Sequence, residues 1–235
     1  MCFSVEADLV AGVVLLPVGV LSLREVRRPR EVPFAALPLL FALHQLVEAL
    51  VWAGESGAVS PCVQQGAALA YVLFAVPVLP VLLPVAVLLL EPRGPRLRVA
   101  PFVVVGAALS VHLLIAVLDG PLVVEVQPHA LVYLVDTPYL ALSTVLYVAV
   151  VVGPSVLSGY RSIVVFGLAN LAGLSIVGVL YVQAFASLWC VWAATSSVLV
   201  LVHMRRRRGL SRGHQMDGDP LHPRPAGRGP RYQDV

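Results

Sequence analysis

The sequence predicts an all-α fold: an integral membrane bundle of seven transmembrane helices, with the N-terminus outside and the C-terminus in the cytoplasm. Three observations predict this fold. Of the 235 residues, 59% are hydrophobic and 12% are charged, whereas an average soluble domain is roughly 45–50% apolar. The apolar residues are grouped in separate runs of about the length that a membrane-spanning helix needs. Arginines occur only in alternate linkers between these runs and in the C-terminal tail.

The membrane spans follow from hydropathy in windows of about 19 residues. The approximate ranges are 4–23, 33–52, 67–90, 99–118, 140–157, 163–181 and 185–202. The first run is followed by arginines rather than preceded by them, which indicates a retained helix and not a signal peptide. Pro33 suits the first turn of the second helix. The third span contains Pro77, Pro80 and Pro84, so we expect a kinked helix there.

The orientation follows from the arginines, because short cytoplasmic loops of membrane proteins hold an excess of positive residues. The linkers after spans one, three and five carry arginine, and the chain leaves span seven at Arg205–Arg208. The linkers after spans two, four and six carry none. This alternation places the N-terminus outside and makes residues 1–204 the membrane domain. Residues 205–235, rich in Arg, Pro and Gly, are predicted to be a disordered cytoplasmic tail.

Composition also excludes some classes of protein. The chain has no lysine, and a seven-helix retinal protein needs a lysine amine for its Schiff base. The arginines lie at span ends and in the tail, so they do not indicate nucleic-acid binding. Their exclusive use indicates a GC-rich, bacterial coding sequence, hence a bacterial cytoplasmic membrane as the location and the lipid bilayer as the partner.

The longest outer linker, residues 119–139, carries two β-prone stretches on either side of Gln127-Pro128-His129. We expect a short β-hairpin on the outer face, the alternative being an irregular loop.

Ionisable residues inside a bilayer cost about 3 kcal/mol each at mid-depth, so the few present mark the candidate site. They are His44, Glu48 and His112, all predicted to lie in the outer half of the membrane. His44, Glu48 and Trp52 are spaced four apart and share one helix face. Cys190 lies in the same outer layer, with His129 above it. Imidazole, carboxylate and thiolate ligate transition metals, so a metal at His44, Glu48 and His112 is a candidate cofactor.

Structural roles compete with these functional ones. Glu48 and His44 can form a buried hydrogen-bonded pair, and Cys190 lies on a stripe of small residues that suits helix packing. A haem between two histidines remains a minor alternative. Cys2 and Cys62 face the outside, where they can pair as a disulfide; a plain structural role is the other favoured interpretation, and an N-terminal thiol nucleophile at Cys2 is the less favoured alternative. The motifs of zinc proteases, P-loops and nucleophile elbows are missing.

Several segments resemble a family of bacterial multi-pass membrane proteins that is classed as a domain of unknown function. They are MCFS at the start, PFAALPLLFALHQLVEALVW (Pro33–Trp52), LLLEPR (Leu88–Arg93), PHALVY in the outer linker and SLWCVWAA in the last span. The resemblance spans all seven predicted helices and leaves out the tail. It implies the fold and the boundaries, and it implies no activity.

Three functions remain open at this point. The first is a binding or sensing module for a small or lipidic ligand at the outer polar site, with or without a metal. The second is a membrane-embedded, hydrolase-like enzyme in which Glu48 acts as general acid or base beside His44. The third, a transporter, is less favoured because the sequence shows no internal repeat.

Overall fold

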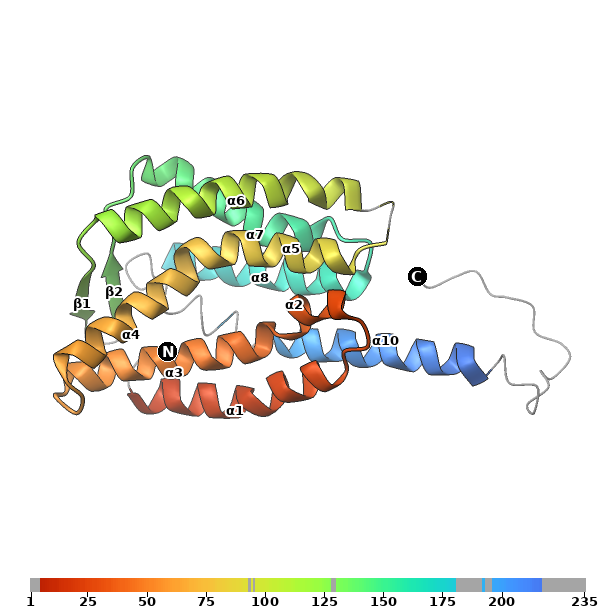
Figure 1. Cartoon of the computed structure of the whole chain (residues 1–235), viewed down its shortest axis with the longest axis horizontal. Coiled ribbons are helices and arrows are strands. Elements are labelled where there is room, and N and C mark those ends of the chain that lie inside the picture. Colours follow the sequence, from red (N-terminus) through yellow and green to blue (C-terminus); the bar gives the residue numbers. More distant parts are fainter. Residues whose placement is uncertain are drawn as a thin grey trace, which may run out of the picture.

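The computed structural model describes residues 5–92, 94, 96–127, 130–180, 192 and 196–216. This part of the chain is mostly helical, with one β-hairpin (Figure 1). Four helical stretches in it are long and apolar enough to cross a membrane: Val5–Arg24, Pro29–Glu55, Pro61–Leu90 and Arg96–Asp119. Two shorter apolar stretches are Leu140–Val156 and Arg161–Ile176. Most of the predicted span 185–202 lies outside the described residues.

The first two long helices lie side by side. Helix α1 (Val5–Arg24) packs along α3 (Leu37–Glu55), and a 3₁₀ turn (Pro29–Glu31) with the short α2 (Val32–Ala35) connects them (Figure 1). Glycines permit the close approach: a Cβ on Gly12 would lie 2.6 Å from the Leu46 side chain, and one on Gly19 would lie 2.6 Å from the Leu39 backbone. Small residues at a helix interface are typical of membrane proteins.

The third predicted span is kinked, as its prolines predict. Helix α4 (Pro61–Leu73) continues through a π-helical turn (Phe74–Val78) into α5 (Leu79–Leu90), and Figure 1 shows the bend between the two. Ser60 caps α4, because its side-chain oxygen accepts the backbone N–H of Val63 at 3.4 Å. Proline follows at the first helical position, where its missing N–H is harmless.

The remaining elements are α6 (Arg96–Asp119), the hairpin strands β1 (Val123–Gln127) and β2 (Ala130–Leu134), α7 (Leu140–Val156), α8 (Arg161–Leu180) and α10 (Val198–Met216). The strands are antiparallel, with Gln127 opposite Ala130, so the predicted hairpin is confirmed. Helix α10 differs from the expectation, since it continues to Met216 although we expected disorder from residue 205. Arginine is a good helix former, and ion pairs to Glu25 and Glu31 hold this part of α10.

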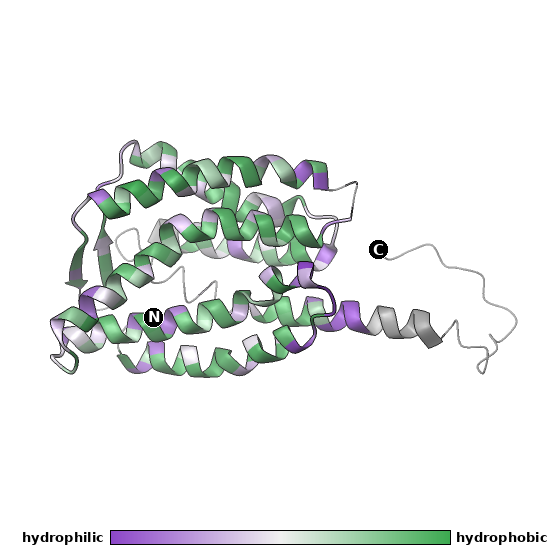
Figure 2. Cartoon of the chain, viewed as in Figure 1, coloured by the Kyte–Doolittle hydropathy of each residue, from purple (hydrophilic) through white to green (hydrophobic). Residues whose placement is uncertain are grey.

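The two ends of the bundle differ in charge. The linker after α1, the α5–α6 and α7–α8 linkers and the exit along α10 gather at one end, which we call the arginine end (Figure 1). The α3–α4 turn and the β-hairpin lie at the other, the hairpin end. Figure 2 shows hydrophobic helix bodies between them, with hydrophilic residues concentrated towards the ends. The linker arginines that the structure describes are at the arginine end.

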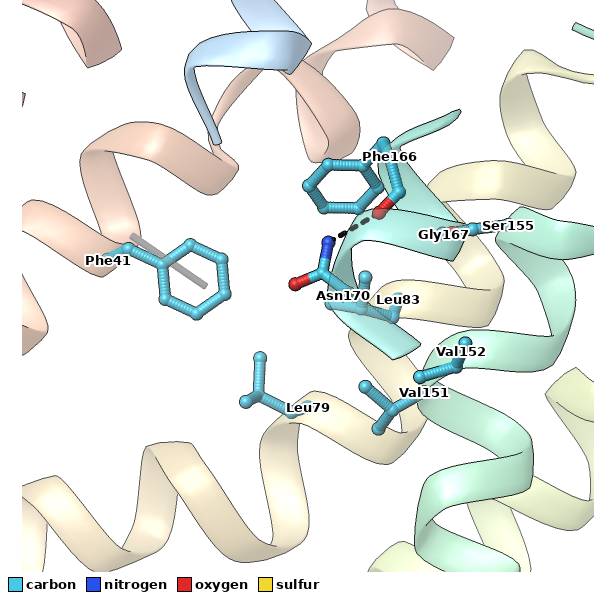
Figure 3. Close-up of a pocket in the computed structure, with 9 residues that line it drawn as sticks. All are labelled: Phe41, Leu79, Leu83, Val151, Val152, Ser155, Phe166, Gly167 and Asn170. Atoms are coloured by element: carbon cyan, nitrogen blue, oxygen red, sulfur yellow. Dashed lines mark hydrogen bonds between the residues drawn. The ribbon is translucent and has the colours of Figure 1, made fainter. Parts of the chain in front are cut away.

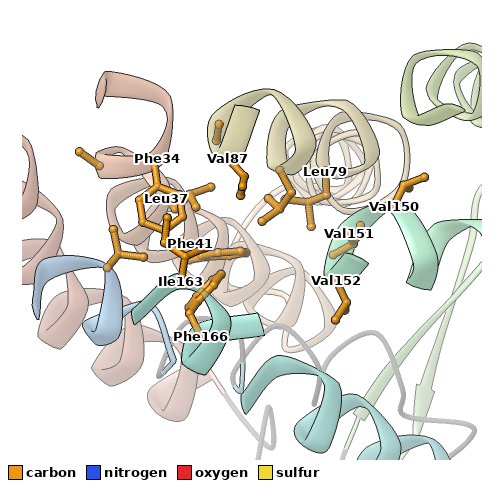
Figure 4. Close-up of a cluster of buried hydrophobic side chains, with 14 of the residues drawn as sticks. Phe34, Leu37, Phe41, Leu79, Val87, Val150, Val151, Val152, Ile163 and Phe166 are labelled. Atoms are coloured by element: carbon orange, nitrogen blue, oxygen red, sulfur yellow. The ribbon is translucent and has the colours of Figure 1, made fainter. Parts of the chain in front are cut away.

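The core lies where α3, α5, α7 and α8 meet. Figure 4 shows aromatic and aliphatic side chains from these helices and from α2 directed towards one another. Phe34 contacts Phe166 edge to face, with ring centroids 6.0 Å apart. Outward-facing apolar side chains remain exposed on α1, α6 and α7, among them Val13, Val104 and Val145. Helices that bury one face and expose apolar residues on the other are what a lipid environment accommodates.

Candidate functional site

A group of buried polar side chains lies on α3 and the start of α1, near the hairpin end. Asp8, Gln45 and Glu48 are fully buried, and His44 is 4% exposed. The Gln45 side-chain amide donates to Asp8 Oδ1 at 3.4 Å. We expected His44 and Glu48 to face the interior, and they do. Asp8 and Gln45 are also buried there, and the sequence analysis did not select them. The feature that could have identified both is a polar residue at the edge of, or within, an apolar run.

A stack of three aromatic rings extends from this group to the hairpin. The His44 imidazole lies parallel to the Tyr71 ring, with centroids 4.0 Å apart, and Tyr71 lies parallel to Tyr133 at 4.5 Å. Two parallel neighbours at these distances must cover opposite faces of Tyr71. The stack therefore connects α3, α4 and β2, and it fixes the plane of the His44 ring.

A cavity of about 260 Å³ borders this stack. Tyr71 and Tyr133 line it from the side of the stack, and α7 supplies Ser143, Thr144 and Tyr147. The rest of its lining is mostly apolar, from the π-helical turn, α6 and the segment after β2. Thr144 is exposed, so this rim reaches the surface of the molecule. A mostly apolar cavity with a few convergent polar groups is typical of a ligand-binding site.

The helix kink borders the same cavity through a hydrogen bond. Leu79 N–H donates to the carbonyl of Phe74 in the π-helical turn, so the next donor in this register would be Pro80, which has no N–H. The Ala75 carbonyl that it would have bonded accepts the Tyr147 hydroxyl instead. One helix away, Ser110 donates to the Pro77 carbonyl. Side chains from α6 and α7 thus satisfy backbone groups near the prolines.

His112 does not join His44 and Glu48. It is half-buried on α6, and its Nε2 lies 3.3 Å from the Pro138 carbonyl oxygen. It lines a separate cavity of about 230 Å³ together with Asp119 and Asp136. In the described part of the chain, no three His, Cys, Asp or Glu side chains are arranged to hold a metal ion. The expected metal group of His44, Glu48 and His112 is therefore not assembled: α6 directs His112 away from α3.

The other candidate residues have mixed outcomes. Trp52 packs beside Val51, Ala67 and Leu131 under the hairpin, so it belongs to a small apolar cluster below the outer surface. Cys62 is a free, exposed cysteine at the start of α4. Cys2, His129 and Cys190 lie outside the described residues, so the roles expected for them stay predictions.

A third, much smaller cavity of about 20 Å³ lies at the centre of the bundle (Figure 3). Its lining is apolar except for Ser155 and Asn170. The Asn170 amide donates to the Phe166 carbonyl at 2.7 Å, and its oxygen accepts from Ser196 at 3.1 Å. A void of this size holds at most one water molecule, so it is no ligand site.

At the arginine end, buried carboxylates hold the linkers. Glu91 is fully buried and accepts the backbone N–H of Gly159 at 3.1 Å and the hydroxyl of Ser158. Glu31 accepts the backbone N–H of Arg27 at 2.9 Å, and Arg207 lies 3.7 Å from its other oxygen. Each carboxylate thus faces either backbone donors or an arginine, which is an arrangement for stability rather than for chemistry.

Comparison with known proteins identifies a family. Neither curated proteins nor solved structures include a match to this sequence. The sequence matches the family described as "Family of unknown function (DUF6629)" over residues 1–215. This range covers both strands and every described helix except the last residue of α10, Met216, and it includes His44, Glu48, Tyr71 and the cavity. The chain therefore belongs to this family of unknown function.

Proposed function

We propose that the chain is a seven-span protein of a bacterial cytoplasmic membrane that binds a small or lipidic ligand at the hairpin end. The observation that carries this proposal is the cavity of about 260 Å³ whose wall includes Tyr71, the ring stacked on His44. A ligand in this cavity would contact Tyr71, whose ring stacks on the buried His44. Cavities of binding sites usually start at about 300 Å³, so a small ligand or one acyl chain fits best.

The proposed orientation places the hairpin end outside and the arginine end in the cytoplasm. Four long apolar helices and the arginine distribution support it. Helix α7, with 17 residues, meets the lower limit of about 17 residues for a spanning helix. Reporter fusions after Ser56 and at the C-terminus test the orientation: Ser56 should report as outside and the C-terminus as cytoplasmic. A cytoplasmic Ser56 would overturn the topology.

A pair of bulky substitutions on α7 tests ligand binding. Val148 lines the cavity, whereas Val145 is 66% exposed and lies outside it. Val148→Trp should fill the cavity, and Val145→Trp is the matched control on the outer face. Organic extracts of the purified proteins should contain one retained small or lipidic molecule in wild type and Val145→Trp, and none in Val148→Trp. Identical extracts from all three proteins, at equal unfolding temperature, would contradict the proposal.

The alternative function is a membrane-embedded enzyme in which Glu48 is the acid or base beside His44. The burial of both side chains supports it, since buried ionisable groups are typical of active sites. Neither residue lines the cavity, although His44 stacks on Tyr71, which does. The described geometry therefore favours binding over catalysis. A transition metal held by His44 and Glu48 would need further ligands from outside the described residues. Metal analysis of wild type, His44→Ala and Glu48→Gln tests this variant.

A further inference from the structure

Three aliphatic hydroxyl groups that line the large cavity have their hydrogen atoms directed at backbone carbonyls. Thr144 donates to the Leu140 carbonyl at 2.8 Å, Ser143 donates to that of Pro138 at 3.4 Å, and Thr137 donates to that of Val135 at 3.4 Å. A hydroxyl has one hydrogen but two acceptor lone pairs. These three side chains can therefore offer the cavity hydrogen-bond acceptors without giving up an existing bond.

The charges around the cavity favour a positively charged ligand. The sequence has no arginine or lysine between Arg30 and Arg93 or between Arg98 and Arg161, and these stretches contain every residue that lines the cavity. The neighbouring cavity of about 230 Å³ carries Asp119 and Asp136. The segment after β2 separates the two, because Val135 and Thr137 line the larger cavity and Asp136 lines the smaller one. A cation is therefore favoured here over an anion.

We propose that the ligand of the large cavity is a short single-chain amphiphile with a primary ammonium group. This inference rests on the proposed function and names the chemical class of its ligand. Ser143, Thr144 and Thr137 would accept the N–H groups, and the chain would lie against Val72, Val76 and Leu113. A primary amine is protonated at pH 7, as a lysine side chain is. It combines the positive charge and the three donors that this wall of acceptors can bind.

Four probes of equal chain length separate charge from hydrogen-bond donation. They are n-hexylamine, hexyltrimethylammonium, 1-hexanol and hexanoate, titrated calorimetrically into the full chain in nanodiscs of zwitterionic lipid at pH 7. Hexylamine should bind most tightly. Hexyltrimethylammonium keeps the charge without donors and should bind at least tenfold more weakly. Hexanol should also bind more weakly, and hexanoate should not bind.

Substitutions of Thr144 test the acceptor role directly. Thr144→Val keeps the shape of the side chain and removes the oxygen, so it should weaken hexylamine binding about tenfold, in line with a hydrogen bond to a charged group. Thr144→Ser keeps the oxygen and is the matched control, with affinity close to wild type. Because Thr144 is exposed, both variants should fold, and their unfolding temperatures verify this.

The outcomes distinguish this inference from the proposed function. If hexyltrimethylammonium or hexanoate binds as well as hexylamine, and Val148→Trp abolishes that binding, the cavity is a ligand site but the ammonium assignment is wrong. Equal affinities of Thr144→Val and wild type for hexylamine would also overturn the assignment. If none of the four probes binds the wild-type protein, both the ammonium assignment and the short amphiphile as ligand fail. The cavity as a ligand site then depends on the extraction experiment with Val148→Trp.

Discussion

The arginine end and the hairpin end of the bundle hold polar groups in different ways. At the arginine end, charged groups meet opposite charges or backbone donors: Glu91 accepts from the α7–α8 linker, and Glu25 and Glu31 face arginines of α10. At the hairpin end, the polar groups of the larger cavity are aromatic rings and hydroxyls, and the smaller cavity has His112, Asp119 and Asp136 in its lining, with no arginine in either. The cavities of about 260 and 230 Å³ both lie there.

This difference separates stability from binding. Removing one partner of a buried charge leaves the other charge uncompensated, which costs several kcal/mol. A hydrogen bond that a side chain makes to a neighbouring helix of a membrane protein contributes only about 0.6 kcal/mol to stability on average. Most of the polar stabilisation should therefore come from the arginine end, while the hairpin end can retain cavities at little cost. The four predictions below test this division, from the largest expected effect to the smallest.

Glu91→Ala should have the largest effect. It removes a fully buried carboxylate and leaves the Gly159 N–H and the Ser158 hydroxyl without their acceptor. Hydrogen bonds to charged groups contribute about 1.5–3 kcal/mol, so we expect a loss of about 3 kcal/mol in thermal unfolding of the detergent-solubilised protein. Glu125→Ala, on the exposed face of β1, is the control and should change little. Equal losses in the two variants would remove the distinction between the ends.

His203 should make the arginine end sensitive to pH. It follows the predicted seventh span directly, is 2% exposed and lies with its Nδ1 2.6 Å from the Ser162 hydroxyl. Burial and, to a smaller extent, the charge of Arg207 lower the pKa of His203 to about 4, against the opposing effect of Glu31. The unfolded chain, with a pKa near 6.5, then binds the proton more readily, so stability falls as the pH falls from about 7 towards 4.

The size of this pH effect follows from the two pKa values. Between pH 7.5 and 5.5 the loss should be about 1.4 kcal/mol. His203→Phe should remove that part of the pH dependence of the unfolding temperature and keep the edge-to-face packing on Phe34. His112→Phe, at the half-buried histidine of the hairpin end, is the control. A wild-type stability that is flat over this range would show that His203 is more solvated than its burial indicates.

Sequence reasoning predicted most of the fold because the relevant signals are local. Apolar runs predict helices, the prolines of the third span predict its kink, and two β-prone stretches predict the hairpin. It did not predict that α10 continues to Met216. The first part of that extension contacts a distant part of the sequence: Arg208 lies 2.6 Å from Glu25, and no window of neighbouring residues contains both.

The candidate site was predicted only in part for the same reason. His44 and Glu48 are conspicuous because charge is rare in the apolar runs, and both are buried. Whether His112 meets them depends on the rotation of α6 about its axis, which hydropathy does not determine. Tyr71, Tyr133 and Tyr147 gave weak signals, because tyrosine is common near membrane interfaces. Their convergence on one cavity depends on the helix kink and on the hairpin folding over it.

Tyr147→Phe tests the weaker polar contacts of the hairpin end. It removes the hydroxyl that donates to the Ala75 carbonyl at the kink, and the ring keeps its packing. The loss should be about 0.6 kcal/mol, the average for such bonds in membrane proteins. Tyr139→Phe, at a residue that is 80% exposed, serves as the control. A loss of 3 kcal/mol or more, comparable with Glu91→Ala, would show that the kink stabilises the fold as much as the arginine end does.

Two arginines that face the same carboxylate give the smallest and most selective test. Arg205 lies 3.9 Å from Glu25 and its side chain is 56% exposed, whereas Arg208 lies 2.6 Å from it and is 36% exposed. Exposed ion pairs contribute about 0–1 kcal/mol, so Arg205→Ala should cost about 0.2 kcal/mol and Arg208→Ala somewhat more. Both losses should shrink in 1 M salt, where the screening length is about 3 Å. Equal losses in the two variants would mean that the arginine end is stabilised by its total charge rather than by particular pairs, and the contrast with the hairpin end would then rest on Glu91 and Glu31 alone.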